Sequence, residues 1–121
     1  MKYSIDFTNK FKKSLRKGVK RGLNPVLIEK AVEKLTNEGK LPPSYKSHKL
    51  HGNFEGIWEC HITPDWLMLW EQNDEKLTLL FLNNGTHSDL LLTLSRIRGF
   101  MLPNIYKFGI LARTLNVVLA E

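Results

Sequence analysis

The segment from residue 54 to residue 83 constrains the fold most, because three strand-like runs follow one another almost without a gap. They cover residues 54–62, 65–72 and 76–83, and the stretches between them read TP and NDE. Proline, asparagine and aspartate favour turns rather than strands. Connections this short join antiparallel neighbours, whereas parallel strands need a long crossover. We therefore predict an antiparallel three-stranded meander.

The first 50 residues predict one further strand and two helices. Residues 2–7 alternate between polar and apolar side chains, which is typical of a short strand. Residues 9–22 repeat apolar side chains every four positions and so predict an amphipathic helix. A second helix begins near Pro25 and ends before Gly39, the usual positions of proline and glycine at helix ends. A helical hairpin packed on one face of a sheet makes this an α+β fold.

The composition favours one globular domain in a reducing compartment. With 121 residues, of which 42% are hydrophobic and 25% charged, the chain is long enough for one core. The single cysteine, Cys60, excludes an internal disulfide, and we place it in the core. The N-terminus has no apolar leader run, so we expect the cytoplasm.

Basic residues are concentrated in the N-terminal part of the chain. Residues 1–50 contain 13 Lys and Arg but 4 Asp and Glu, whereas residues 51–91 contain one Lys and seven Asp and Glu. A polyanion would bind such a surface because phosphate neutralisation releases counterions, although an ordinary solvated helix has the same pattern. The candidates for RNA or ribosome binding lie on the first helix: Lys12, Lys13, Arg16, Lys17, Lys20 and Arg21.

Residues 92–121 differ in composition from residues 1–91. From residue 104 onward, apolar side chains recur at a spacing of three and four, which predicts a helix. This helix is shorter than the roughly 20 residues that a membrane span needs and contains Lys107 and Arg113. We therefore divide the chain into a domain of residues 1–91 and a helical extension, packed on that domain or on a second copy.

The predicted meander brings reactive side chains to one edge of the sheet. The end of its first strand, the start of its second and the end of its third lie together. His61 closes the first strand, Asp65 and Trp66 open the second, and His87 follows the third. With adjacent strands about 4.8 Å apart, the backbones of His61 and His87 are expected about 10 Å from each other. Trp66 shares a strand face with Met68 and Trp70, which we expect in the core.

Two imidazoles near a carboxylate are suited to proton transfer. One can take the proton of a ribose 2′-OH and another can protonate the departing 5′ oxygen, which cuts RNA without a metal. Asp65 can orient an imidazole, stabilise its charged form or act as a base. Hydrogen-bonded structural histidines and a zinc site use the same residue types. Because no H-x-x-x-H pair occurs, we expect no bound metal.

Three motifs resemble the YafQ branch of the RelE family of mRNA interferases, the toxins of type II toxin–antitoxin modules. They are FKKSLRK, LPPSYKSHKLHGNFEGIWECHITPDWLMLW and GTHSDL, in the family's order and spacing over residues 2–91. The resemblance implies a microbial RNase-like fold and cleavage of mRNA on the ribosome without a metal or an organic cofactor. It also implies a cognate antitoxin, which we expect to be acidic and encoded nearby.

The resemblance implies a role for each matching residue. The histidine of the Y-K-x-H loop falls on His48, which only the resemblance places in the site, as the base. His87 is the expected acid, and His61 with Asp65 stabilises the transition state or relays a proton. Lys46 and Trp66 are the expected substrate-binding residues.

The chain departs from the family pattern near the end of the match. The family often has an aromatic residue after the last histidine, where this chain has Leu90 and Leu91. Family members also usually end near this point, whereas this chain continues. An alternative function is therefore a catalytically impaired homologue that binds the ribosome, RNA or antitoxin without cleavage. A metal-dependent hydrolase is a third, and His51 is expected to be an ordinary loop residue.

Overall fold

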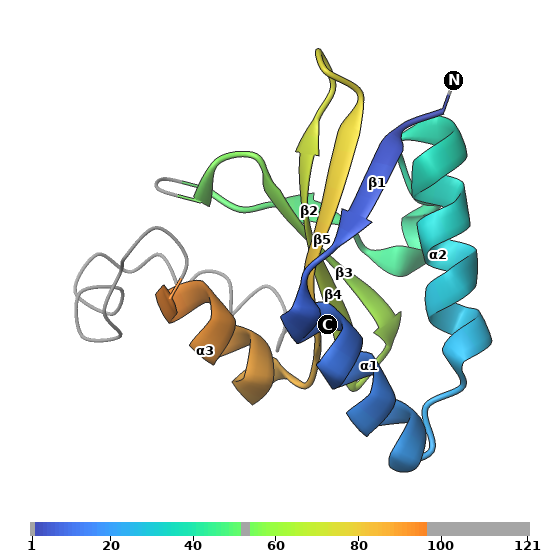
Figure 1. The fold of residues 1–121 in the computed structure, drawn as a ribbon, viewed down its shortest axis with the longest axis vertical. Coiled ribbons are helices and arrows are strands. Elements are labelled where there is room, and N and C mark those ends of the chain that lie inside the picture. Colours follow the sequence, from blue (N-terminus) through green and yellow to red (C-terminus); the bar gives the residue numbers. More distant parts are fainter. Residues whose placement is uncertain (1, 52–53, 97–121) are drawn as a thin grey trace.

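A mixed five-stranded sheet forms the centre of the molecule, with strand order β1-β5-β4-β3-β2 (Figure 1). The computed structural model describes residues 2–51 and 54–96. β1 pairs with β5 in parallel, and all other neighbouring strands are antiparallel. The strands are β1 (Ser4–Phe7), β2 (His48–Lys49), β3 (Ile57–Thr63), β4 (Trp66–Asn73) and β5 (Thr78–Gly85). The predicted antiparallel meander is therefore confirmed as β3, β4 and β5.

The first two helices begin where the sequence predicts, but α1 ends at Lys20, two residues before the predicted end. The Thr8 side chain caps α1 (Asn9–Lys20) by accepting a hydrogen bond from the backbone N–H of Phe11. α2 (Pro25–Glu38) begins at its proline and ends at Gly39, whose φ of 71° lies in the left-handed region. A short 3-10 helix, η1 (Pro43–Tyr45), follows in the proline-led loop.

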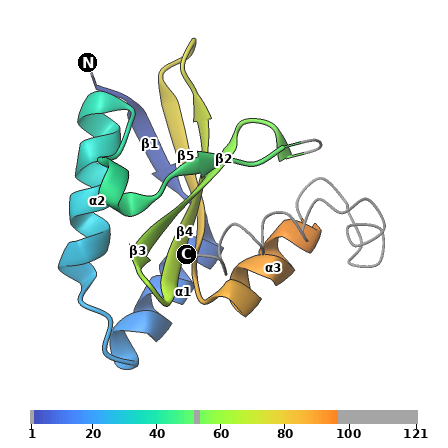
Figure 2. The same cartoon turned by 180° about the vertical axis from the view of Figure 1, so that it is seen from behind.

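A third helix, α3 (His87–Arg96), was not predicted. It crosses the predicted domain boundary between residues 91 and 92. The helix expected from residue 104 onward lies outside the described residues. Figures 1 and 2 show α3 and α2 on opposite sides of the sheet. The fold is nevertheless α+β as expected, with helices on both faces rather than a hairpin on one.

Two apolar clusters fill the spaces on either side of the sheet. The larger cluster joins α1 and α2 to the sheet and includes Phe11, Leu35, Trp70 and Phe81. The smaller one lies under α3; its buried members are Leu50, Phe54, Ile57, Leu67, Leu69, Leu90 and Leu94. Successive side chains of a strand point to opposite faces, so a strand covered on both sides is apolar at every position. This accounts for the uninterrupted burial of Trp66 to Trp70 in β4.

Three strand boundaries differ from the predicted ones. The run predicted to start at residue 54 begins at Ile57, because the chain turns at Gly56, where φ is 89°. Phe54 is fully buried without belonging to a strand, so its apolar side chain made the predicted strand start too early. β1 begins two residues later than predicted, and β5 is shifted by two residues toward the C-terminus. The two-residue strand β2 was not predicted and is too short to show a period.

Candidate active site

His61 and His87 lie in contact at one edge of the sheet. His61 pairs with Leu67 across β3 and β4, and Leu67 pairs with Gly85 across β4 and β5. His87 follows two residues after Gly85, and its ring meets that of His61 at a centroid distance of 6.4 Å and an angle of 69°. The predicted convergence of these two histidines is confirmed.

One ring nitrogen of His87 is buried where the strand ends meet. The residue begins α3, and its imidazole is half-buried. Its Nε2 atom is shielded from solvent and has no hydrogen-bond partner within residues 2–51 and 54–96. Burying a ring nitrogen without a hydrogen bond costs free energy unless a ligand supplies the missing partner. His87 is therefore suited to exchange a proton or a hydrogen bond with a bound molecule.

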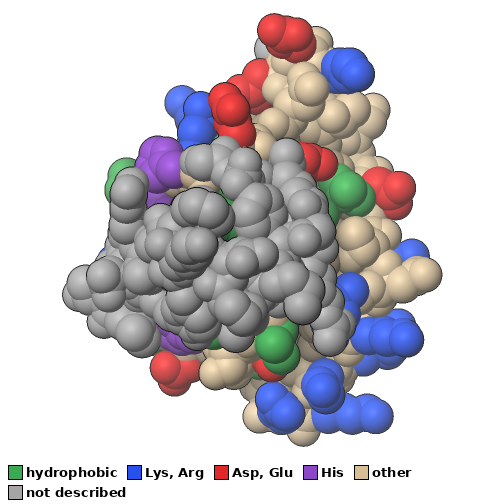
Figure 3. Space-filling model, turned by 90° about the vertical axis from the view of Figure 1, so that its left-hand side faces the viewer, with side chains coloured by type: hydrophobic (Ala, Val, Ile, Leu, Met, Phe, Trp, Pro, Cys, Tyr) green, Lys and Arg blue, Asp and Glu red, His purple; other side chains and the backbone are tan. Residues whose placement is uncertain are grey.

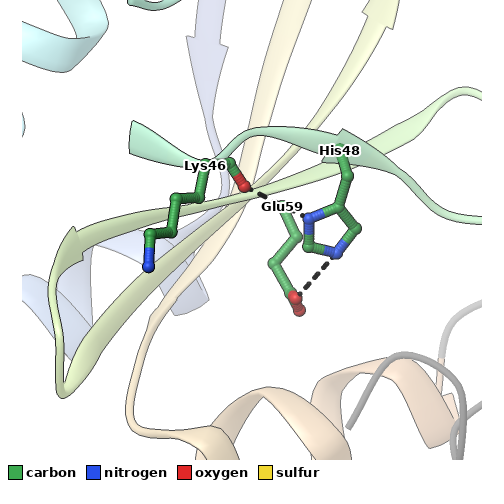
Figure 4. Close-up of polar contacts among 3 residues, drawn as sticks. All are labelled: Lys46, His48 and Glu59. Carbon is green, nitrogen blue, oxygen red and sulfur yellow. Dashed lines mark hydrogen bonds and ion pairs between the residues drawn. The ribbon is translucent and has the colours of Figure 1, made fainter. Parts of the chain in front are cut away.

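His48 pairs with a buried glutamate that sequence reasoning missed. β2 places His48 opposite Glu59 of β3, and the His48 Nε2 atom lies 3.2 Å from a carboxylate oxygen of Glu59 (Figure 4). The Glu59 side chain is 2% exposed. Because Glu59 precedes His61 by two residues, both point to the same sheet face. The alternation of side chains along this strand therefore indicates from the sequence that Glu59 lies on the same face as His61.

The two ring nitrogens of His48 each face an oxygen atom. The Nδ1 atom lies 3.3 Å from the backbone oxygen of Lys46, an acceptor, so Nδ1 carries the hydrogen of this bond. In a neutral ring Nε2 would then be bare and would face the lone pairs of a carboxylate. The contact at 3.2 Å is favourable when one of the two groups is protonated. The contact is an ion pair when the imidazole is protonated.

Lys46 contributes its backbone rather than its side chain to this arrangement. Its residue adopts a left-handed conformation with φ of 52°, which turns its carbonyl toward the His48 ring. Figure 4 shows its side chain extending away from that ring.

Asp65 lies in the turn between β3 and β4, Trp66 begins β4, and the two residues differ in exposure. Asp65 is exposed, whereas Trp66 is 8% exposed and packs in the larger core cluster with Met68 and Trp70, as expected for that strand face. The indole N–H of Trp66 donates to the Asn84 side chain at 3.0 Å. The ring lies so close to α1 that a Cβ on Gly18 would come within 2.7 Å of it.

A cavity of about 450 Å³ between α1 and α3 reaches the edge of Trp66. Lys10 and Lys17 line it from α1, and Asp89 and Thr93 line it from α3. Trp66 is therefore a core residue with one edge toward a polar opening.

The basic residues predicted on the first helix are all exposed, five of them on α1 and Arg21 directly after its end. In the view of Figure 3, Lys and Arg side chains gather at the lower right of the molecule, and histidine side chains lie toward its left edge. No acidic residue occupies the first turn of α1. This surface can bind an anion independently of the histidines.

Cys60 lies in the core, as predicted. It is fully buried in the larger apolar cluster, and burial raises the pKa of its thiol. Within the described ranges, no group of three or more His, Cys, Asp or Glu side chains is placed to hold a metal ion. None of the helices described has the length and apolar character needed to cross a bilayer.

Comparisons with known proteins agree with this architecture. Residues 3–92 match the family model described as the bacterial toxin of type II toxin–antitoxin systems, YafQ. The "mRNA interferase toxin YafQ" of Escherichia coli K12 is 29% identical over 87 residues, which cover 71% of this chain and 92% of that protein. The putative toxin YafQ of Haemophilus influenzae is also 29% identical, with 69% and 87% covered.

Solved structures extend the likeness to three dimensions. A crystal structure of the E. coli DinJ–YafQ toxin–antitoxin complex has a TM-score of 0.68 at 27% identity, covering 74% of this chain and 98% of that chain. A metal-bound toxin from Helicobacter pylori has a TM-score of 0.66 at 36% identity, covering 73% and 98%. The family model spans most of the chain and includes all four histidines. This chain therefore belongs to the YafQ family of bacterial toxins of type II toxin–antitoxin systems.

Proposed function

We propose that this chain is a ribosome-dependent endoribonuclease that cleaves mRNA by acid–base catalysis, with the ribose 2′-OH as nucleophile. The observation that carries the proposal is the contact between His61 and His87 at the sheet edge. The curated E. coli relative is named an mRNA interferase, which supports the same substrate. Cleavage inhibits translation and takes place in the cytoplasm, where mRNA is engaged by ribosomes.

The reaction requires two proton transfers and one exchange of bonds at phosphorus. A base takes the 2′-OH proton while the 2′ oxygen bonds to phosphorus, and an acid protonates the 5′ oxygen as its bond to phosphorus breaks. The products are a 2′,3′-cyclic phosphate and a 5′-OH end. The residues proposed for these steps are His48, His61, Asp65 and His87, with no metal taking part.

The contacts of His48 refine the roles expected from the family pattern. A carboxylate oxygen of Glu59 lies 3.2 Å from the His48 Nε2 atom and would stabilise a protonated imidazole, which suits the pair to donate a proton or to stabilise negative charge. The Nε2 atom of His87 is buried and has no hydrogen-bond partner among the described residues. We therefore propose that the His48–Glu59 pair supplies the proton or stabilises the phosphorane, while His87 exchanges the other proton. Asp65, exposed in the adjacent turn, binds or orients the substrate.

Glu59→Gln is expected to lower the cleavage rate at neutral pH about tenfold or more. The amide keeps the volume of the side chain but removes the carboxylate that lies 3.2 Å from the His48 Nε2 atom, so the pair can no longer act as proposed. Glu75→Gln, in the exposed turn between β4 and β5, is the control. An unchanged rate would exclude the Glu59 pair from catalysis.

The basic surface of α1 is proposed to contact ribosomal RNA phosphates. If it does, log affinity for ribosomes should fall steeply with log salt concentration, and each lost contact should flatten the slope by about 0.7 to 0.9. A triple charge reversal should therefore flatten the slope by about two to three. The positions are Lys12, Lys13 and Arg16, and binding is measured by sedimentation at several salt concentrations.

The control reverses the charge of three exposed lysines on α2 and just after it, Lys30, Lys34 and Lys40. Both triple variants change the net charge by the same amount. Equal slopes for the two triple variants would mean that net charge, and not the α1 surface, governs binding. The α1 surface can also bind an acidic antitoxin, because structures of the relative contain YafQ together with DinJ. A cognate antitoxin is accordingly the proposed protein partner.

Primer extension on mRNA in a translating extract tests the function itself. The purified chain is expected to cut mRNA when ribosomes are present, to leave free mRNA intact, and to keep its activity in a chelator. Ribosome binding without cleavage would instead support the impaired homologue, for which Leu91 at the aromatic position is the specific reason. Loss of cleavage in chelator would support metal-dependent hydrolysis.

A further inference from the structure

We propose that Asp89 is a positioning residue that holds His87 in the site through reciprocal capping of α3 with Thr86. The residue touches neither substrate nor reacting atoms; it acts through the backbone on which His87 stands. The activity test below rests on the proposed function, whereas the spectroscopic test does not.

Thr86 and Asp89 close a loop of two hydrogen bonds around His87. The backbone N–H of Thr86 donates to the Asp89 carboxylate at 3.1 Å, and the backbone N–H of Asp89 donates to the Thr86 hydroxyl at 3.4 Å. The N–H of Leu90 then donates to the Thr86 carbonyl at 3.1 Å, which starts the helix. This is a capping box in which aspartate takes the place usually filled by glutamate. His87 is the first residue inside it.

The imidazole of His87 depends on this turn because its ring has little else to direct it. Within the described part of the chain the ring makes no hydrogen bond and lies edge-on against the ring of His61. Its direction is therefore set by its own rotamer and by the backbone at the start of α3. A change in that backbone changes where Nε2 points.

The approach of Asp89 to the end of β5 also requires the glycine that precedes Thr86. A Cβ on Gly85 would lie 2.9 Å from both the Cβ and a carboxylate oxygen of Asp89. The φ of Gly85 is +156°, which further disfavours a side chain there. The sequence Gly85-Thr86-His87 thus admits the carboxylate against the strand end and turns the chain into α3.

Contacts elsewhere on α3 keep the helix docked without the Asp89 carboxylate. Leu90 and Leu94 are buried in the smaller apolar cluster. The Asn83 side chain donates to the Thr93 hydroxyl, and that hydroxyl donates to the Asp89 backbone carbonyl. Loss of the carboxylate should therefore loosen the first turn, where His87 lies, while the rest of the helix stays in place.

Asp89→Ala is expected to lower mRNA cleavage about 10- to 100-fold, the scale of a small misplacement of a catalytic group. Asp89→Asn keeps an oxygen that can accept from the Thr86 N–H and should recover most of the rate. Thr86→Val should reduce cleavage, and Thr86→Ser should restore it. Ser88→Ala, an exposed change in the same turn, should leave the rate unchanged. Thermal unfolding of each variant verifies that the domain remains folded.

Histidine ring resonances, recorded by NMR on the full chain, give a readout independent of activity. In Asp89→Ala the His87 resonances are expected to shift and broaden as the ring samples several orientations, and those of exposed His51 should not change. Unchanged His87 resonances and a wild-type rate in Asp89→Ala would overturn the proposal. So would an Asp89→Asn variant as impaired as Asp89→Ala. If the wild-type chain cleaves no mRNA, the resonances alone decide the question.

Discussion

His87→Ala is expected to lower ribosome-dependent mRNA cleavage by about 100-fold or more, the contribution usual for a side chain that transfers a proton in the transition state. The substitution removes the ring that meets His61 and the buried nitrogen that lacks a described partner. Expression of the variant should no longer arrest growth. The measurement is primer extension on a reporter mRNA in a translating extract, together with growth after induction.

A matched control separates this effect from a general one. His51→Ala removes an exposed imidazole from the loop before β3 and should leave cleavage unchanged. Both variants should unfold close to the wild-type temperature, because neither ring belongs to the apolar clusters. Full cleavage by folded His87→Ala would end the proposed mechanism, since the observation that carries it would then have no chemical consequence.

Phe81→Ala is expected to reduce the free energy of unfolding by about 3 to 5 kcal/mol. Phe81 is fully buried in the middle of β5, and its ring lies 5.0 Å from that of Phe7 and 5.8 Å from that of Phe11. It thus joins β1, α1 and β5 at one point. Because a domain of this size is stable by only about 5 to 15 kcal/mol, the variant should be close to unfolding.

Urea denaturation followed by tryptophan fluorescence measures this loss. Leu92→Ala removes a large apolar side chain that is 53% exposed on α3 and should change stability by no more than about 0.5 kcal/mol. If the two variants are equally stable, the three phenylalanine rings do not form the joint that holds β1 and α1 to the sheet.

Local patterns predict much of this fold because its turns are short. The stretches TP and NDE leave antiparallel pairing as the one way to connect three strands, and this pairing brings His61 to His87. Helix ends at Pro25 and Gly39 are equally local. Where a few neighbouring residues determine a turn or a helix end, the sequence alone predicts that element.

Long-range pairing and very short elements were not predictable in the same way. Nothing near Ser4 indicates that it pairs in parallel with Thr78, and nothing in two residues reveals β2. His48 entered the candidate site only through the family resemblance, and its partner Glu59 emerged from the pairing of β2 with β3. The sequence prediction lacks α3 because its first turn lies inside the GTHSDL motif. Its capping residues, Thr86 and Asp89, were present in that motif.

The parallel pairing of β1 with β5 has a consequence for synthesis of the chain. Ser4 is made more than 70 residues before its partner Thr78. At about 5 to 20 residues per second, a ribosome needs several seconds to deliver the second strand, and contacts so distant in sequence also fold slowly. His87 emerges later still. A growing chain thus cannot assemble the candidate site on the ribosome that is making it until His87 has been translated.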